Sequence, residues 1–189
     1  MRPVRWATAV ALLGAAITPR QASAQVSVFV EKGPDVGAVA ADFTAVSVTA
    51  DTLAAPGSFS LWKTRGQVVV LAFFPKVFMS GSDAQFATFR DRYAELFGAG
   101  VTVVGVSADA TDELGRYANY LRLPLQLLSD PGQKIGTRFG LVVRPGQPTR
   151  RAVYVIGRDG AVTYREFRFD PTTASSFDRL RSAVQAARR

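Results

Sequence analysis

Two runs of apolar, β-branched residues, separated by a segment with helical spacing, most constrain how this chain can fold. The first run covers residues 67–74 and the second covers residues 101–106. Apolar runs of this length are typical of strands that are covered on both faces. Between them, large apolar side chains recur at helical spacing, at Phe86, Phe89, Tyr93, Leu96 and Phe97. The pattern predicts a β-α-β unit whose helix, of about 15 residues, starts near Ser82.

The rest of the chain extends this unit into a larger α/β domain. Residues 43–49 and 125–128 have the pattern of short strands, and residues 152–156 and 161–166 flank a Gly-rich turn that indicates a hairpin. Apolar residues at helical spacing predict further helices around residues 114–121, before Phe139, and at Phe177, Leu180 and Val184. A length of 189 residues fits one domain with a short appendage.

The first 24 residues have the features of a signal peptide. Arg2 and Arg5 precede an apolar run at residues 6–17, and Ala22-Ser23-Ala24 resembles a cleavage site before Gln25. We therefore expect a secreted, periplasmic protein with a signal peptide at 1–24, an extended N-terminal arm at 25–41 and one domain at 42–189. An uncleaved membrane anchor is the alternative, although the run is shorter than the about 20 residues that a spanning helix needs.

The chain contains neither cysteine nor histidine, which restricts its chemistry more than any other aspect of its composition. Disulfides, thiol nucleophiles, Ser-His catalysis and ordinary zinc sites are excluded, and we expect no metal and no cofactor. The formal net charge is +8, but the arginines are scattered and no basic helix carries interleaved aromatic residues. Nucleic acid is therefore not an expected partner.

The stretch 69–82, which reads VVLAFFPKVFMSGS, resembles the active-site strand and loop of peroxiredoxins. The similarity is greatest to the bacterioferritin comigratory protein branch of the alkyl hydroperoxide reductase and thiol-specific antioxidant group. Further matching segments stand at the right intervals, at residues 36–44, 60–66, 89–91, 105–107, 127–130 and 151–156. The resemblance implies a thioredoxin-like α/β fold with a central mixed sheet and helices on both faces, and a possible homodimer.

The resemblance also implies where the site lies. The family loop carries Pro, then Thr four residues later and the catalytic Cys three residues after that, with a distant Arg. Here Pro75 and Arg151 match, whereas Met79 stands at the Thr position and Ser82 at the Cys position. A second cysteine found in some members corresponds to Ala87.

Two interpretations of these positions stay open on sequence alone. Ser80 or Ser82 could cap the helix, with Gln85 completing a capping box, or Ser82 could be a nucleophile. Met79 is expected to fill the former peroxide pocket, and Arg151 either pairs with a carboxylate or keeps a function. The first functional hypothesis is a non-catalytic scaffold that binds a protein or a small anion through Arg151 and the amides of residues 81–83. The alternative is a thioredoxin-dependent peroxidase that reduces hydrogen peroxide and organic hydroperoxides.

Overall fold

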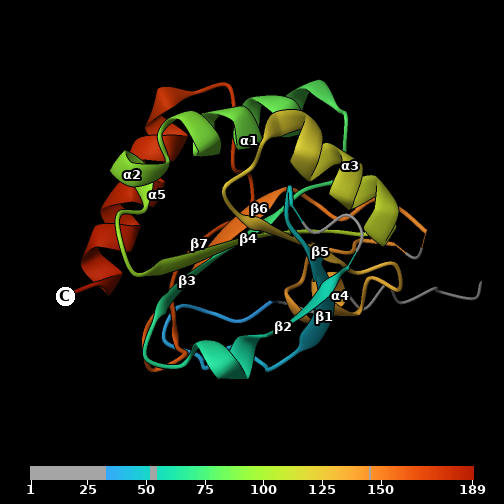
Figure 1. Ribbon diagram of the computed structural model, residues 1–189. Coiled ribbons are helices and arrows are strands. Elements are labelled where there is room, and N and C mark those ends of the chain that lie inside the picture. The colour runs from blue at the N-terminus through green and yellow to red at the C-terminus, as the bar shows by residue number, and fades with distance from the viewer. Residues whose placement is uncertain (1–32, 52–54, 145) are drawn as a thin grey trace, which may run out of the picture.

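The computed structural model describes residues 33–51, 55–144 and 146–189 (Figure 1). The predicted signal peptide and the first part of the predicted arm lie outside the described residues. The described part of the arm runs beside β7 (Val162–Glu166). There the amide of Gly37 donates to the carbonyl of Val162 at 2.8 Å, and the amide of Ala40 donates to that of Gly160 at 3.0 Å. Among the described helices, none is long and apolar enough to cross a membrane.

A seven-stranded mixed sheet forms the centre of the domain, in the order β2-β1-β5-β4-β3-β6-β7. The three inner strands β5, β4 and β3 are parallel, and the outer strands join them antiparallel. This arrangement confirms the predicted mixed sheet. The other strands are β1 (Thr44–Val48), β2 (Gly57–Ser60), β3 (Val68–Phe73), β4 (Val101–Ser107), β5 (Gln126–Ser129) and β6 (Ala152–Ile156).

Strand β3 is buried along its whole length because both faces of the sheet are covered. Val68, Val70 and Ala72 face one apolar core, and the alternating residues Val69, Leu71 and Phe73 face the other. Successive side chains of a strand point to opposite faces of the sheet, so alternate residues of β3 belong to different cores. Continuous hydrophobicity in the run 67–74 reflects this double coverage, as the sequence predicts.

Helices cover both faces of the sheet, as expected (Figure 1). Side chains of α1, α2, α3 and α5 enter the first core, and those of α4 and of the short 3-10 helix η1 enter the second. The bounds are α1 (Ser80–Asp91), α2 (Tyr93–Leu96), α3 (Thr111–Leu121), α4 (Lys134–Arg138), α5 (Ala174–Ala187) and η1 (Leu61–Thr64).

The helix predicted to start near Ser82 differs from the one observed. It begins at Ser80, ends at Asp91, and continues as α2 after a break at Arg92. The Arg92 guanidinium lies 5.9 Å from the centre of the Phe177 ring and donates to Glu95 at 2.7 and 2.9 Å. The residue at the break thus connects the end of this helical segment to α5.

Candidate functional site

The loop that carries the candidate site follows β3 and is held by a buried carboxylate. The amide of Val77 donates to Oδ2 of Asp109 at 2.9 Å, and the hydroxyl of Ser107 donates to the same oxygen at 2.6 Å. Ser107 is the last residue of β4, which pairs with β3 in parallel. The loop is therefore attached to the carboxyl ends of two inner strands, and α1 starts above that edge of the sheet.

Ser82 lies inside the first turn of α1 and does not cap the helix. The N-cap is Met79, with φ −96° and ψ 139°, and no side chain caps this end. Ser82 is 0% exposed, and its hydroxyl donates to the carbonyl of Lys76 at 2.7 Å. The capping interpretation of Ser80 and Ser82 was wrong, because the backbone becomes helical earlier than the capping-box spacing indicates.

Arg151 lies directly before β6 and contacts Ser82 through its guanidinium group. Its Nη2 lies 3.4 Å from the Ser82 Oγ, and its Nη1 donates to Oε1 of Gln85. Gln85 is fully buried, and because the N-cap is Met79 it does not stand at the N3 position that a capping box requires. It lies three residues after Ser82, which places both side chains on the same helix face. That spacing is the signal by which sequence reasoning could have placed Gln85 beside Ser82 on α1.

Burial of the Arg151 guanidinium lowers its pKa, and the nearby groups Tyr117 and Asp170 partly offset this effect. None of the described carboxylates forms an ion pair with Arg151 within 4.0 Å. Of the two interpretations of Arg151, pairing with a carboxylate is therefore wrong, since neutral oxygens of Ser82 and Gln85 accept its hydrogen bonds. Within the described part of the chain, Nε2 of Gln85 is buried without a hydrogen-bond partner. The site thus combines a cation with neutral polar groups.

Met79 does not fill a pocket above Ser82, contrary to expectation. Its side chain is 49% exposed, and the neighbouring Phe78, which has a positive φ of 56°, is 51% exposed. A residue at the N-cap projects from the end of the helix rather than into the core. The carbonyl of Lys76 and the guanidinium of Arg151 are the groups that contact the Ser82 hydroxyl instead.

Replacing Met79 with threonine is expected to raise the free energy of unfolding by about 1 kcal/mol, because a threonine at an N-cap accepts a hydrogen bond from a first-turn amide. Met79 already has the extended backbone of an N-cap but offers no such acceptor. Urea denaturation measures the change. Met79→Ala is the matched control, since it removes the same side chain without adding an acceptor. An equal gain in Met79→Ala would show that the methionine, rather than the missing cap, limits stability.

Tyr117, which lies in the helix predicted around residues 114–121, also belongs to the surroundings of the site. Its hydroxyl donates to Oδ1 of Asp83 at 2.9 Å, and its ring lies 5.1 Å from that of Phe78 in an edge-on contact. Burial, with Asp83 as the second cause, raises the pKa of Tyr117 above its ordinary value. The carboxylate of Asp83, which follows Ser82 in the chain, therefore already accepts a hydrogen bond from Tyr117.

The remaining candidates are not brought to the Ser82 hydroxyl. Pro75 ends the strand segment and lines a separate depression of about 300 Å³ together with Asp109, Gln133 and Pro148.

The amides of Ser82 and Asp83 both donate to the carbonyl of Met79, at 2.8 and 2.9 Å. Of the amides of residues 81–83 that were expected to bind an anion with Arg151, those of Ser82 and Asp83 are therefore already used in helix formation. The described residues hold no group of three acidic side chains that could bind a metal.

The comparisons with known proteins agree with this architecture. A family model described as "AhpC/TSA family" matches residues 36–165. The chain belongs to this family. It therefore shares the AhpC/TSA scaffold, and the resemblance of the loop predicts that Ser82 stands at the position of the reactive cysteine. A member of the AhpC/TSA family without any cysteine has no thiol with which to reduce peroxide.

The curated relatives are peroxiredoxins. "Peroxiredoxin Q, chloroplastic" of Sedum lineare is 35% identical over 108 residues, which are 54% of this chain and 56% of that protein. The protein of the same name from Gentiana triflora is 32% identical over 145 residues, 76% of this chain and 63% of that protein. The chain thus spans about half to under two thirds of the length of these relatives.

Solved structures of the AhpC/TSA group share the fold. The peroxidoxin BcpB of Mycobacterium tuberculosis has a TM-score of 0.71 at 24% identity, covering 82% of this chain and 99% of that one. The AhpC of Enterococcus faecalis has a TM-score of 0.71 at 17% identity, covering 82% of this chain and 93% of that one. These similarities establish the thioredoxin-like arrangement of the sheet and helices.

Proposed function

We propose that this chain is a non-catalytic member of the AhpC/TSA family that acts as an exported binding protein. One observation carries the proposal: the group at the nucleophile position is a fully buried serine hydroxyl that donates to the carbonyl of Lys76 at 2.7 Å. The features of residues 1–24 favour export to the periplasm. Binding, rather than chemistry, is the activity that the remaining groups support.

Peroxide reduction by a thiol needs an anionic sulfur that attacks one peroxide oxygen and becomes a sulfenic acid, while the O–O bond breaks and the other oxygen leaves as water or an alcohol. A hydroxyl needs an adjacent base before it becomes a nucleophile. The acceptor of the Ser82 proton is a neutral carbonyl, and the chain has no histidine. Asp83 accepts from Tyr117 instead. These contacts favour a positioning role for Ser82, in which its oxygen helps to hold Arg151.

Arg151 is the group that suits binding. It lies near no ion-pairing carboxylate among the described residues, and two neutral oxygens orient it. An oriented guanidinium without a paired carboxylate is suited to an incoming anion. A small anion is therefore the class of ligand that we propose for this protein.

The purified mature chain is expected to consume neither hydrogen peroxide nor an alkyl hydroperoxide faster than buffer does, with thioredoxin or dithiothreitol as the reductant. The reason is that no side chain can form the sulfenic intermediate. Peroxide concentration followed over time after removal of trace metal tests this. Ser82→Ala is the matched control and should give the same background. Turnover that depends on wild-type protein and disappears in Ser82→Ala would favour the alternative, a working peroxidase.

A further inference from the structure

A depression of about 360 Å³, lined by Arg150, Arg151, Phe167 and Arg168, lies where β6 begins and β7 ends. These strands run antiparallel, with Val153 opposite Glu166. The residues just before β6 therefore lie beside the residues just after β7. The register of the hairpin brings three arginines to one hollow, although Arg168 is far from the other two in the sequence.

The positive charge of this arginine depression is not neutralised by ion pairs within the described part of the chain. None of its three arginines has a carboxylate partner within 4.0 Å there. Arg165, by contrast, forms an ion pair with Asp35. The carboxylate that acts on Arg151 through space is Asp170, whose Oδ1 already accepts from the amide and hydroxyl of Thr172 at 2.9 and 2.7 Å.

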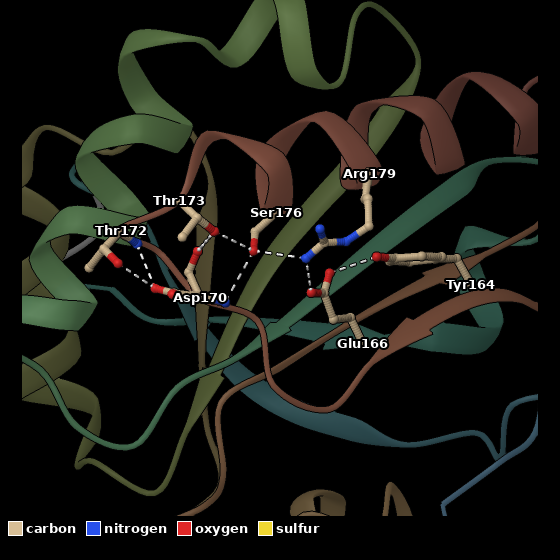
Figure 2. Close-up of polar contacts among 7 residues, drawn as sticks. All are labelled: Tyr164, Glu166, Asp170, Thr172, Thr173, Ser176 and Arg179. Carbon is tan, nitrogen blue, oxygen red and sulfur yellow. Dashed lines mark hydrogen bonds and ion pairs between the residues drawn. The ribbon is translucent and has the colours of Figure 1, made fainter.

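A polar network holds the segment that supplies Phe167 and Arg168. Figure 2 shows Glu166 between Tyr164 and Arg179, accepting the Tyr164 hydroxyl at 2.6 Å and pairing with the guanidinium. On the other side of Phe167 and Arg168, Asp170 is held by Thr172 (Figure 2). Both flanks of the two lining residues are therefore anchored. Because this segment is already ordered, it loses less conformational entropy when a ligand binds.

Two of the lining side chains, those of Phe167 and Arg151, are held by contacts of their own. The Phe167 ring lies 5.0 Å from the Arg165 guanidinium carbon and 5.9 Å from the Tyr154 ring. Two N–H groups of Arg151 are used by Gln85 and Ser82. A guanidinium has five N–H donors. Arg151 therefore keeps donors for a ligand in the depression, and it connects the depression to the buried serine.

We propose that the arginine depression binds the phosphate group of a small molecule. This proposal rests on the proposed function, since it names the ligand class and the place for the anion. Three guanidinium groups match a phosphate, which carries about −1.5 to −2 charges at pH 7 and three acceptor oxygens. A carboxylate has one charge and two oxygens. The volume of about 360 Å³ lies within the range of small-molecule sites, about 300–1,000 Å³.

The test is calorimetric titration of the mature chain with phenyl phosphate, inorganic phosphate and benzoate at constant ionic strength. Phenyl phosphate and inorganic phosphate distinguish an ester from the free ion, and benzoate presents the same ring with a carboxylate. Arg150→Gln and Arg168→Gln should each weaken phosphate binding about 10-fold or more, the cost of one charged hydrogen bond. Arg158→Gln removes the same charge from the turn at the other end of the hairpin and should change nothing.

Binding of phenyl phosphate should also strengthen as the pH rises from 5 to 7, because the second pKa of a phosphate monoester is about 6 and the dianion forms in this range. Benzoate, which is already ionised, should not follow this trend. The proposal would be overturned if neither phenyl phosphate nor inorganic phosphate bound. It would also be overturned if Arg158→Gln weakened phosphate binding as much as Arg150→Gln and Arg168→Gln did, or if benzoate bound with the same affinity as phenyl phosphate. Each of these results leaves the peroxide-consumption result unaffected, so failure of the phosphate site is distinguishable from failure of the non-catalytic assignment.

Discussion

Ser82→Cys is expected to create a thiol whose pKa lies below the about 8.5 of a free cysteine. The new sulfur replaces an oxygen that lies 3.4 Å from Nη2 of Arg151. An opposite charge within about 4–6 Å lowers an acid's pKa by about 1–3. The position inside the first turn of α1 adds a smaller effect of the same sign, about 0.3–1 kcal/mol from the helix dipole.

Two features of the site oppose this decrease in the thiol pKa. Burial of residue 82 disfavours a thiolate, and the carbonyl of Lys76, 2.7 Å from the serine oxygen, favours a protonated group that donates to it. We expect the guanidinium to prevail, because Arg151 has no ion-pairing carboxylate among the described residues and borders an open depression. The thiolate would supply the missing counter-charge.

Thiolate absorbance against pH measures the new pKa. Adding Arg151→Gln to Ser82→Cys should raise it by at least about 1, whereas adding Arg158→Gln at the far end of the hairpin should leave it unchanged. A thiol at or above the pKa of free cysteine would show that residue 82 does not stand in the electrostatic environment described above. Ser82 would then not stand at the position of the family's nucleophile.

Phe86→Ala is expected to cost about 3–5 kcal/mol of unfolding free energy, as for other buried phenylalanines. The ring is 0% exposed and makes edge-on contacts with Phe74, Phe89 and Tyr117 at 4.8, 5.8 and 6.2 Å. A Cβ built on Gly105 would lie 2.8 Å from the Phe86 Cζ, so the ring packs directly against β4. Its loss leaves a cavity between α1 and the sheet.

Urea denaturation monitored by circular dichroism measures this loss, which is a large part of the about 5–15 kcal/mol of a typical domain. Tyr120→Ala is the control, because Tyr120 is a large aromatic residue that is 66% exposed, and surface changes usually stay within about 0.5 kcal/mol. Phe86→Leu keeps most of the volume and serves if the alanine variant does not fold. Similar losses in Phe86→Ala and Tyr120→Ala would contradict the packing described for α1.

The sequence by itself determined the fold class and the order of most elements, although it did not predict the short edge strand β2. Continuous apolar runs identified β3 and β4, because strands covered on both faces cannot alternate with polar residues. Helical spacing identified α3 and α5 for a similar reason, since each buries one face. The end of α1 was not predictable in this way, because the apolar spacing continues through the break at Arg92.

Sequence also identified Ser82 and Arg151 as candidates, through the resemblance of the loop and the spacing along the chain. Only the tertiary structure decided what these residues contact. The hydroxyl of Ser82 reaches back to Lys76, and Gln85 and Arg151 meet across 66 residues of sequence. The arginine depression depends on the antiparallel register of β6 and β7. Local spacing carries no information about such long-range contacts, because they form only when the sheet and α1 pack together.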